Sequence, residues 1–231
     1  MRRAILLLAV FGMTTGITQA DPARRIERET HEWTFFTKPE AALNDLPNVL
    51  IVGDSIARGY FGGTAAALKN RANSYLFSTS KSVGDPALAE ELATFFRQYP
   101  ARFDVVVFNN GMHGWAYSEE EFEKWFPEFV DALRAGAPEA KFIWVPITPV
   151  RNDRPPRADG SPGCSNGRID ARNRIAEAFL KTQGIAIRDF RPDLRAGGDV
   201  YADDIHFNEA GIRRQAASVA EAVADVLPTK R

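Results

Sequence analysis

The stretch "LPNVLIVGDSIARGYFGG" (residues 46–63) places a short apolar run directly before Gly53-Asp54-Ser55. The run from Val49 to Val52 is too short for a helix and rich in β-branched residues, so it predicts a buried strand. The residues from Ile56 to Lys69 predict a helix. Gly, Asp and Ser favour turns and helix caps, so the junction can be an ordinary turn between a strand and a helix. It can equally be a nucleophile at the carboxyl end of a strand, where open α/β sheets place their ligand crevices.

Strand and helix patterns alternate through the rest of the chain. Further strands are predicted at residues 74–80, "FDVVVFNN" (103–110), "KFIWVPITPV" (141–150) and "IAIRDF" (185–190). Further helices are predicted at residues 85–99, 118–136, 169–183 and 209–227. In the second of these stretches, Ser118 and Glu121 form a capping box and Gly136 ends the helix. This alternation predicts a parallel sheet of about five strands with helices on both faces, a three-layer α/β/α architecture.

The first twenty residues have the pattern of a secretory signal peptide. Arg2 and Arg3 precede an apolar run from Ala4 to Met13, and small and polar residues follow up to a cleavage site after Ala20. No later segment reaches eighteen uninterrupted apolar residues, so we expect no membrane anchor. The sequence therefore predicts a secreted or periplasmic protein.

Two parts are expected after the signal peptide. Residues 21–46 begin charged and continue with Trp33, Phe35 and Phe36, which predicts an N-terminal extension whose aromatic side chains pack on the domain. Residues 47–231 have the length and pattern of one α/β domain with a sizeable core.

Composition excludes some classes of function. The chain has 29 Lys and Arg against 30 Asp and Glu, so the basic surface expected of a nucleic-acid-binding protein is absent at the level of net charge. The single cysteine, Cys164, cannot form an internal disulfide. Because no histidine lies near it in the sequence, a bystander thiol is a better interpretation of Cys164 than a nucleophile.

A histidine and an aspartate near the C-terminus can activate the serine of the opening stretch. A serine hydroxyl needs a base within hydrogen-bonding reach, and the base needs a third group to orient it. The chain has three histidines, and one of them, His206, follows Asp203 by three residues. Asp203, Asp204 and His206 could also begin a metal site, but no second cluster with ligand spacing accompanies them. We interpret Asp204 as a solvated neighbour of Asp203. Asp54 is interpreted as a structural residue that holds the serine turn by side-chain hydrogen bonds.

Four blocks, taken in order, resemble those of the SGNH or GDSL hydrolases. They are "GDS" (53–55), the glycine of "SKSVGDP" at position 84, "NNGMH" (109–113) and "DDIHFNEAG" (203–211). The resemblance extends from about Leu46 to the C-terminus and implies a flavodoxin-like three-layer fold. Together with "ITPV", the blocks are also similar to an exported bacterial subgroup associated with carbohydrate esterases.

The resemblance implies a role for each matching residue. Ser55 is the nucleophile, His206 the general base and Asp203 the acid that orients it. The backbone N–H groups of Ser55 and Gly84 donate to the oxyanion. The family's third donor is an asparagine, and the alignment places His113 there. A neutral imidazole N–H can donate a hydrogen bond, so we expect His113 to serve, with Asn110 as the alternative donor.

The implied activity is hydrolysis of a small acyl ester, acetyl being the first choice, on a small molecule or a polysaccharide. We expect neither a cofactor nor a metal. "GDSIA" lacks the second glycine of Gly-x-Ser-x-Gly, which argues against an α/β-hydrolase. A lipase or thioesterase of the same family, and a catalytically weak carbohydrate-binding protein on the same fold, remain alternatives. Trp115, Tyr60 and Tyr117 lie near the predicted site, either to stack on a sugar or to fill the core.

Overall fold

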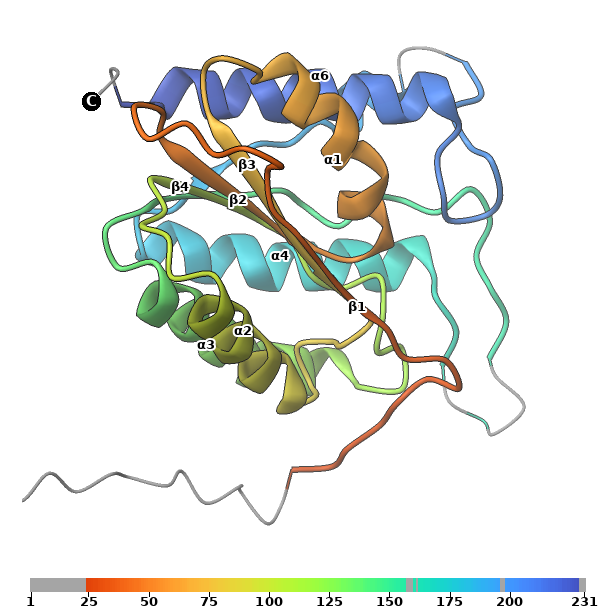
Figure 1. Cartoon of the computed structure of the whole chain (residues 1–231). Helices are drawn as coiled ribbons and strands as arrows, with labels where there is room; N and C mark the ends of the chain where they lie inside the picture. The colour runs from red at the N-terminus through yellow and green to blue at the C-terminus, as the bar shows by residue number, and fades with distance from the viewer. Residues whose placement is uncertain (1–23, 157–159, 161, 196–197, 229–231) are drawn as a thin grey trace, which may run out of the picture.

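A six-stranded sheet with helices on both faces forms the centre of the computed structural model (Figure 1). The structure describes residues 24–156, 160, 162–195 and 198–228, so the predicted signal peptide lies outside it. The strands are β1 (Thr34–Thr37), β2 (Asn48–Gly53), β3 (Asn73–Thr79), β4 (Val105–Phe108), β5 (Lys141–Trp144) and β6 (Ala186–Ile187). The helices are α1 (Ser55–Ala67), α2 (Ala87–Gln98), α3 (Glu119–Gly136), α4 (Asn166–Thr182), α5 (Arg191–Arg195) and α6 (Glu209–Val226).

The strand order across the sheet is β1-β3-β2-β4-β5-β6. Strands β2 to β6 pair in parallel, which confirms the predicted three-layer α/β/α fold with five parallel strands. Strand β1 is an addition to that prediction. It comes from the N-terminal extension and pairs antiparallel with β3, with Thr34 opposite Thr79. The extension is therefore part of the sheet.

Alternate residues of the central strand β2 supply the cores on the two faces of the sheet. Leu50 and Val52 pack with the side chains of α2, α3 and α4, whereas Val49 and Ile51 pack with those of α1 and α6. Figure 1 shows the same division, with α1 and α6 on one face and α2, α3 and α4 on the opposite face. Successive side chains of a strand point to opposite faces, so a continuous apolar run is what a strand covered on both faces requires.

Capping side chains fix where the helices begin. The predicted capping box of α3 is present, since Ser118 accepts from the Glu121 N–H and the Glu121 carboxylate accepts from the Ser118 N–H, and α3 ends at Gly136 as predicted. At the start of α6 the Asn208 side chain accepts from two backbone N–H groups. Within the part of the chain that the structure describes, no helix is long and apolar enough to span a bilayer.

Candidate active site

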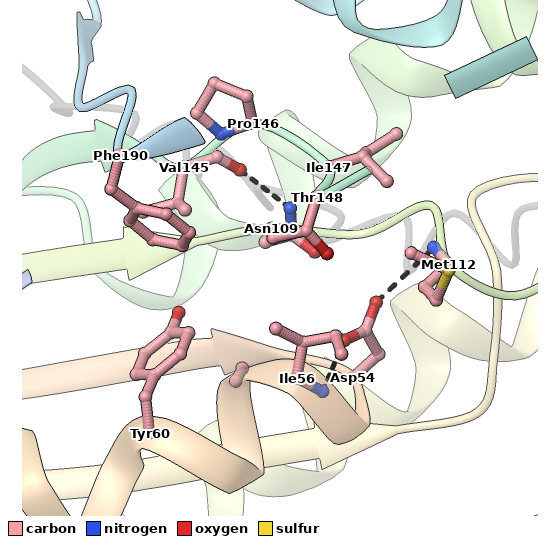
Figure 2. Close-up of a pocket in the computed structure, with 11 residues that line it drawn as sticks. Asp54, Ile56, Tyr60, Asn109, Met112, Val145, Pro146, Ile147, Thr148 and Phe190 are labelled. Atoms are coloured by element: carbon pink, nitrogen blue, oxygen red, sulfur yellow. Dashed lines mark hydrogen bonds between the residues drawn. The ribbon is translucent and has the colours of Figure 1, made fainter. Parts of the chain in front are cut away.

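The serine turn is held by the fully buried carboxylate of Asp54, which caps helix α1. One oxygen of Asp54 accepts from the Ile56 N–H at 2.9 Å, and the other accepts from the Met112 N–H at 3.4 Å (Figure 2). Asp54 therefore connects the serine turn to the loop after β4. Ser55 is the first residue of α1, so its own backbone N–H has no partner within the helix. These contacts fit the structural role predicted for Asp54.

Ser55, His206 and Asp203 form a continuous chain of hydrogen bonds across two distant segments. Ser55 Oγ lies 3.0 Å from His206 Nε2, and His206 Nδ1 lies 2.8 Å from Asp203 Oδ2. Because a carboxylate only accepts, Nδ1 carries the proton and the Nε2 of the neutral ring accepts from the serine hydroxyl. The structure brings together the three residues that the sequence selected, although Ser55 and His206 are 151 residues apart along the chain.

The turn before α6 fixes the ionised form of Asp203. A backbone bridge between Tyr201 and Phe207 closes this turn. Oδ1 of Asp203 accepts from the N–H groups of Ile205 and His206, each at 2.7 Å. Desolvation opposes ionisation, but these two bonds and the His206 ring together outweigh it and lower the pKa of Asp203 to about 2. The aspartate is therefore a carboxylate throughout the neutral range.

A pocket of about 260 Å³ opens beside the serine. Ser55 and His206 form part of its lining, and the loop after β4 contributes His113 and Trp115. Glu29, from the N-terminal extension, also lines it. The remaining lining residues are Met112, Arg154, Pro155, Gly163, Cys164 and Ile205. An activated hydroxyl thus faces a partly apolar space that can receive an acyl group.

Comparison with known proteins identifies the family. The model of the GDSL-like lipase/acylhydrolase family matches residues 51–214. The chain belongs to this family. The predicted resemblance is thereby confirmed, and the protein is a serine ester hydrolase. No curated protein matches the chain.

Solved structures of this hydrolase fold are similar over most of the chain. A carbohydrate esterase of family 3 from Talaromyces cellulolyticus is 13% identical, with a TM-score of 0.56 over 78% of this chain and 97% of that one. The aryl esterase of M. smegmatis is 16% identical, with a TM-score of 0.61 over 78% and 100%. The catalytic domain of peptidoglycan O-acetyltransferase A from Streptococcus pneumoniae is 17% identical, with a TM-score of 0.52 over 81% and 99%. At these identities the likeness concerns the fold alone.

His113 lines the pocket of the hydrolase, as expected for an oxyanion donor, but its bonding differs from the expectation. Its Nδ1 lies 3.0 Å from the Glu29 carboxylate, and its buried Nε2 has no partner among the described residues. A carboxylate at Nδ1 holds a proton there, so the Nε2 of a neutral ring accepts rather than donates. The predicted neutral donor therefore needs correction: with Glu29 ionised, Nε2 donates only when the ring is protonated on both nitrogens.

Two of the predicted donors, Asn110 and Gly84, are not among the residues that line the pocket. Asn110 is buried and holds the loop after β3, because it donates to the Lys81 carbonyl at 2.8 Å and accepts from the Val83 N–H at 3.0 Å. Gly84 belongs to the same loop and is in close contact with Tyr117: a Cβ at position 84 would lie 2.5 Å from that ring. Asn110 and Gly84 thus belong to the packing of the loop after β3.

Two residues that organise the site of the hydrolase were missed in the sequence. Glu29 gives no local signal. Arg172 does: it lies on the buried stripe of α4 and is 1% exposed. Its guanidinium donates to the carbonyls of Gly111, His113, Gly114 and Tyr117 and pairs with Glu119. Arg172 therefore holds the loop that carries His113, and an arginine at a buried helical position could have revealed it.

The other residues singled out in the sequence lie outside the serine–histidine–aspartate chain. Cys164 is buried in the pocket wall, and desolvation raises the pKa of its thiol to about 11, which fits a bystander. Trp115 lines the pocket, whereas Tyr60 and Tyr117 are buried and do not. The Asp204 carboxylate accepts from Asn152, outside the serine–histidine chain. Among the described residues no cluster of three or more His, Cys, Asp and Glu side chains has a metal-binding arrangement.

Proposed function

We propose that the protein is an exported esterase that removes a short acyl group, most simply acetyl, from a carbohydrate, with Ser55, His206 and Asp203 as its catalytic triad. The observation that carries this proposal is the hydrogen-bonded chain from Ser55 Oγ through both nitrogens of His206 to Asp203. Nucleophile, base and orienting acid are each within bonding distance of the next, which is the arrangement that acyl transfer requires.

The reaction proceeds in two halves. Ser55 Oγ attacks the ester carbonyl carbon while its proton passes to His206 Nε2. The tetrahedral intermediate then collapses, and the departing alcohol oxygen takes this proton. A water molecule next gives a proton to His206 and attacks the acyl-enzyme. The carboxylic acid leaves as Ser55 regains its proton. Asp203, ionised throughout, stabilises the imidazolium that forms twice in each cycle.

The size of the pocket supports a short acyl group over a long one. Its volume of about 260 Å³ is below the roughly 300–1,000 Å³ of pockets that enclose drug-sized ligands. Buried side chains of Met112, Trp115 and Cys164 form part of its wall, so a longer acyl chain requires their displacement. The carbohydrate part of the proposal has support in the fold it shares with a family 3 carbohydrate esterase.

A chain-length series tests the activity. We expect kcat/KM to fall from 4-nitrophenyl acetate through butyrate to octanoate, and acetylated oligosaccharides to release acetate. A preference for octanoate would favour the lipase-like alternative. Ser55→Ala should lower kcat by about 10⁴-fold or more with unchanged Tm. Ser74→Ala is the matched control, because the Ser74 hydroxyl is buried in β3 without a hydrogen-bond partner among the described residues.

Export is a separate part of the proposal. The basic and apolar pattern of residues 1–20 supports it, although these residues lie outside the described structure. The mass of the protein recovered from a bacterial host should correspond to a chain that begins at Asp21, in the periplasm or medium. Recovery of uncleaved chain from the cytoplasm alone would refute export without affecting the esterase assignment.

A further inference from the structure

The strongest unexplained feature of the pocket is a second carboxylate–histidine pair. Glu29 Oε2 and His113 Nδ1 are 3.0 Å apart, and their side chains are only 25% and 16% exposed. The pair lines the same pocket as Ser55 and His206. Glu29 comes from the N-terminal extension, outside the residues that match the family. Its bond to His113 therefore joins the extension to the segment that matches the family model.

The buried Nε2 atom of His113 has no hydrogen-bond partner among the described residues, although its ring lines the pocket. A buried polar group without a partner is costly unless a ligand supplies one. In the neutral ring with Nδ1 bonded to a carboxylate, this atom is an acceptor. With one more proton in the pair, it becomes a donor. The proton count of the pair therefore decides what Nε2 can bind.

The charges around the ring favour the extra proton. Burial disfavours the charged ring, but the hydrogen bond to Glu29 and the negative charges of Asp54, Glu29 and Glu32 outweigh burial and raise the pKa of His113. The Trp33 ring packs edge-on against the imidazole at 5.7 Å between centroids. The charged and titratable groups around the pair include Glu32 with its partner Lys81, Asp54, and Arg172 at the His113 carbonyl. Arg154, Cys164 and His206 line the same pocket.

We propose that Glu29 is a positioning residue that acts through His113, keeping the ring doubly protonated so that Nε2–H donates to the carbonyl oxygen of the ester as it becomes an oxyanion. This rests on the proposed esterase function. The two histidines of the pocket then work in opposite proton states. His206 must be neutral to take the serine proton, whereas His113 must be protonated to donate.

The test is the pH dependence of kcat in wild type and three variants. Wild type should lose activity at alkaline pH as the pair loses its proton. Glu29→Gln keeps an acceptor for Nδ1 but removes the charge, so this alkaline loss should move to lower pH. His113→Asn supplies an N–H donor that does not titrate, so the loss should disappear. Glu27→Gln, in the same extension but paired with Arg25, is the control and should match wild type.

A double variant separates action through His113 from any other effect. Once position 113 is asparagine, adding Glu29→Gln should change kcat less than twofold. In the wild-type background, at alkaline pH, the same change should lower kcat toward the 10²- to 10³-fold loss of a single oxyanion donor. An equal loss in both backgrounds, or a Glu29→Gln pH profile identical to that of wild type, would overturn the proposal. Tm measurements identify any variant in which the extension has detached.

Nitrogen NMR of the imidazole ring reads the pair without a substrate. At neutral pH the His113 ring of the full chain should show protons on both Nδ1 and Nε2, and Glu29→Gln should lose one of them at lower pH than wild type does. A singly protonated His113 ring at neutral pH in wild type would refute the proposal. If the ring is doubly protonated but no ester is hydrolysed, the proposed function fails and the donor role fails with it, while the pairing stands.

Discussion

Asp203→Asn is the change that most directly examines the catalytic chain. The carboxylate accepts three hydrogen bonds: two from backbone N–H groups at Oδ1, each 2.7 Å long, and one from His206 Nδ1 at Oδ2, 2.8 Å long. In asparagine the amide oxygen can keep both backbone bonds, so the turn should retain its shape. The amide NH₂ then replaces Oδ2. Two donors face each other unless the ring moves its proton from Nδ1 to Nε2.

The magnitude follows from that change of tautomer. With its proton on Nε2, His206 can no longer accept the proton of Ser55, which lies 3.0 Å away. An Asp-to-Asn change in the Ser-His-Asp arrangement lowers kcat about 10⁴-fold, or about 5.4 kcal/mol at about 1.36 kcal/mol for each tenfold change. We expect a loss of this order here. Because the backbone bonds remain, the free energy of unfolding should change little.

Steady-state kinetics with 4-nitrophenyl acetate measure the effect, and urea unfolding measures the stability. The matched control is Asp204→Asn, whose carboxylate accepts from Asn152 outside the serine–histidine chain, and it should stay within about threefold of wild type. If Asp203→Asn remains within tenfold of wild type, or if Asp204→Asn is the more damaging change, the assignment of the orienting acid is wrong.

Three further experiments examine the loop held by Arg172, the thiol of Cys164 and the packing of β1. Arg172→Met removes a buried guanidinium from four carbonyl groups and from Glu119, and should lower the free energy of unfolding by about 3 kcal/mol in urea titrations; a neutral effect would contradict its role in the loop. Because the pKa of Cys164 is about 11, a disulfide reagent at pH 8 should label the thiol in urea far faster than in the native protein, and equal rates would show that the site opens. Phe36→Ala removes a stacked contact with Phe77 and should cost about 1–2 kcal/mol, whereas Phe35→Ala, 45% exposed, should cost under about 0.5 kcal/mol; equal losses would contradict the observed facing of β1.

Local sequence rules predicted most of the fold because each rule acts within a few residues. The continuous apolar run of β2 is buried on both faces, as such a run predicts, and Ser118 and Glu121 cap α3 through local bonds. Strand β1 could not be found in this way. Its four residues alternate between half-buried and exposed, and they become a strand only by pairing with β3, some 40 residues later. Such pairing depends on tertiary contact rather than on the propensity of the segment.

The residues of the candidate site also differ in whether a local sequence signal revealed them. Asp203 and His206 are three residues apart, so their turn was visible in the sequence, and the order of the family blocks identified Ser55 as their partner. Glu29 and His113 are 84 residues apart, and one of them lies in a segment without a motif. Arg172 is intermediate, since its place on the buried stripe of α4 is a local signal although its four carbonyl partners are not.

The two carboxylate–histidine pairs share one bonding pattern but differ in their surroundings, and this difference can separate their functions. His206 is 48% exposed at the pocket mouth, so water can solvate its ring as the proton moves on and off. His113 is 16% exposed and has three carboxylates around it, so a proton there is held by charges that do not move during the reaction. Exposure at one histidine, and burial among fixed carboxylates at the other, fit one of them to act as base and the other as donor. The N-terminal extension, by delivering Glu29, then determines the alkaline limit of activity, and the family fold supplies the base.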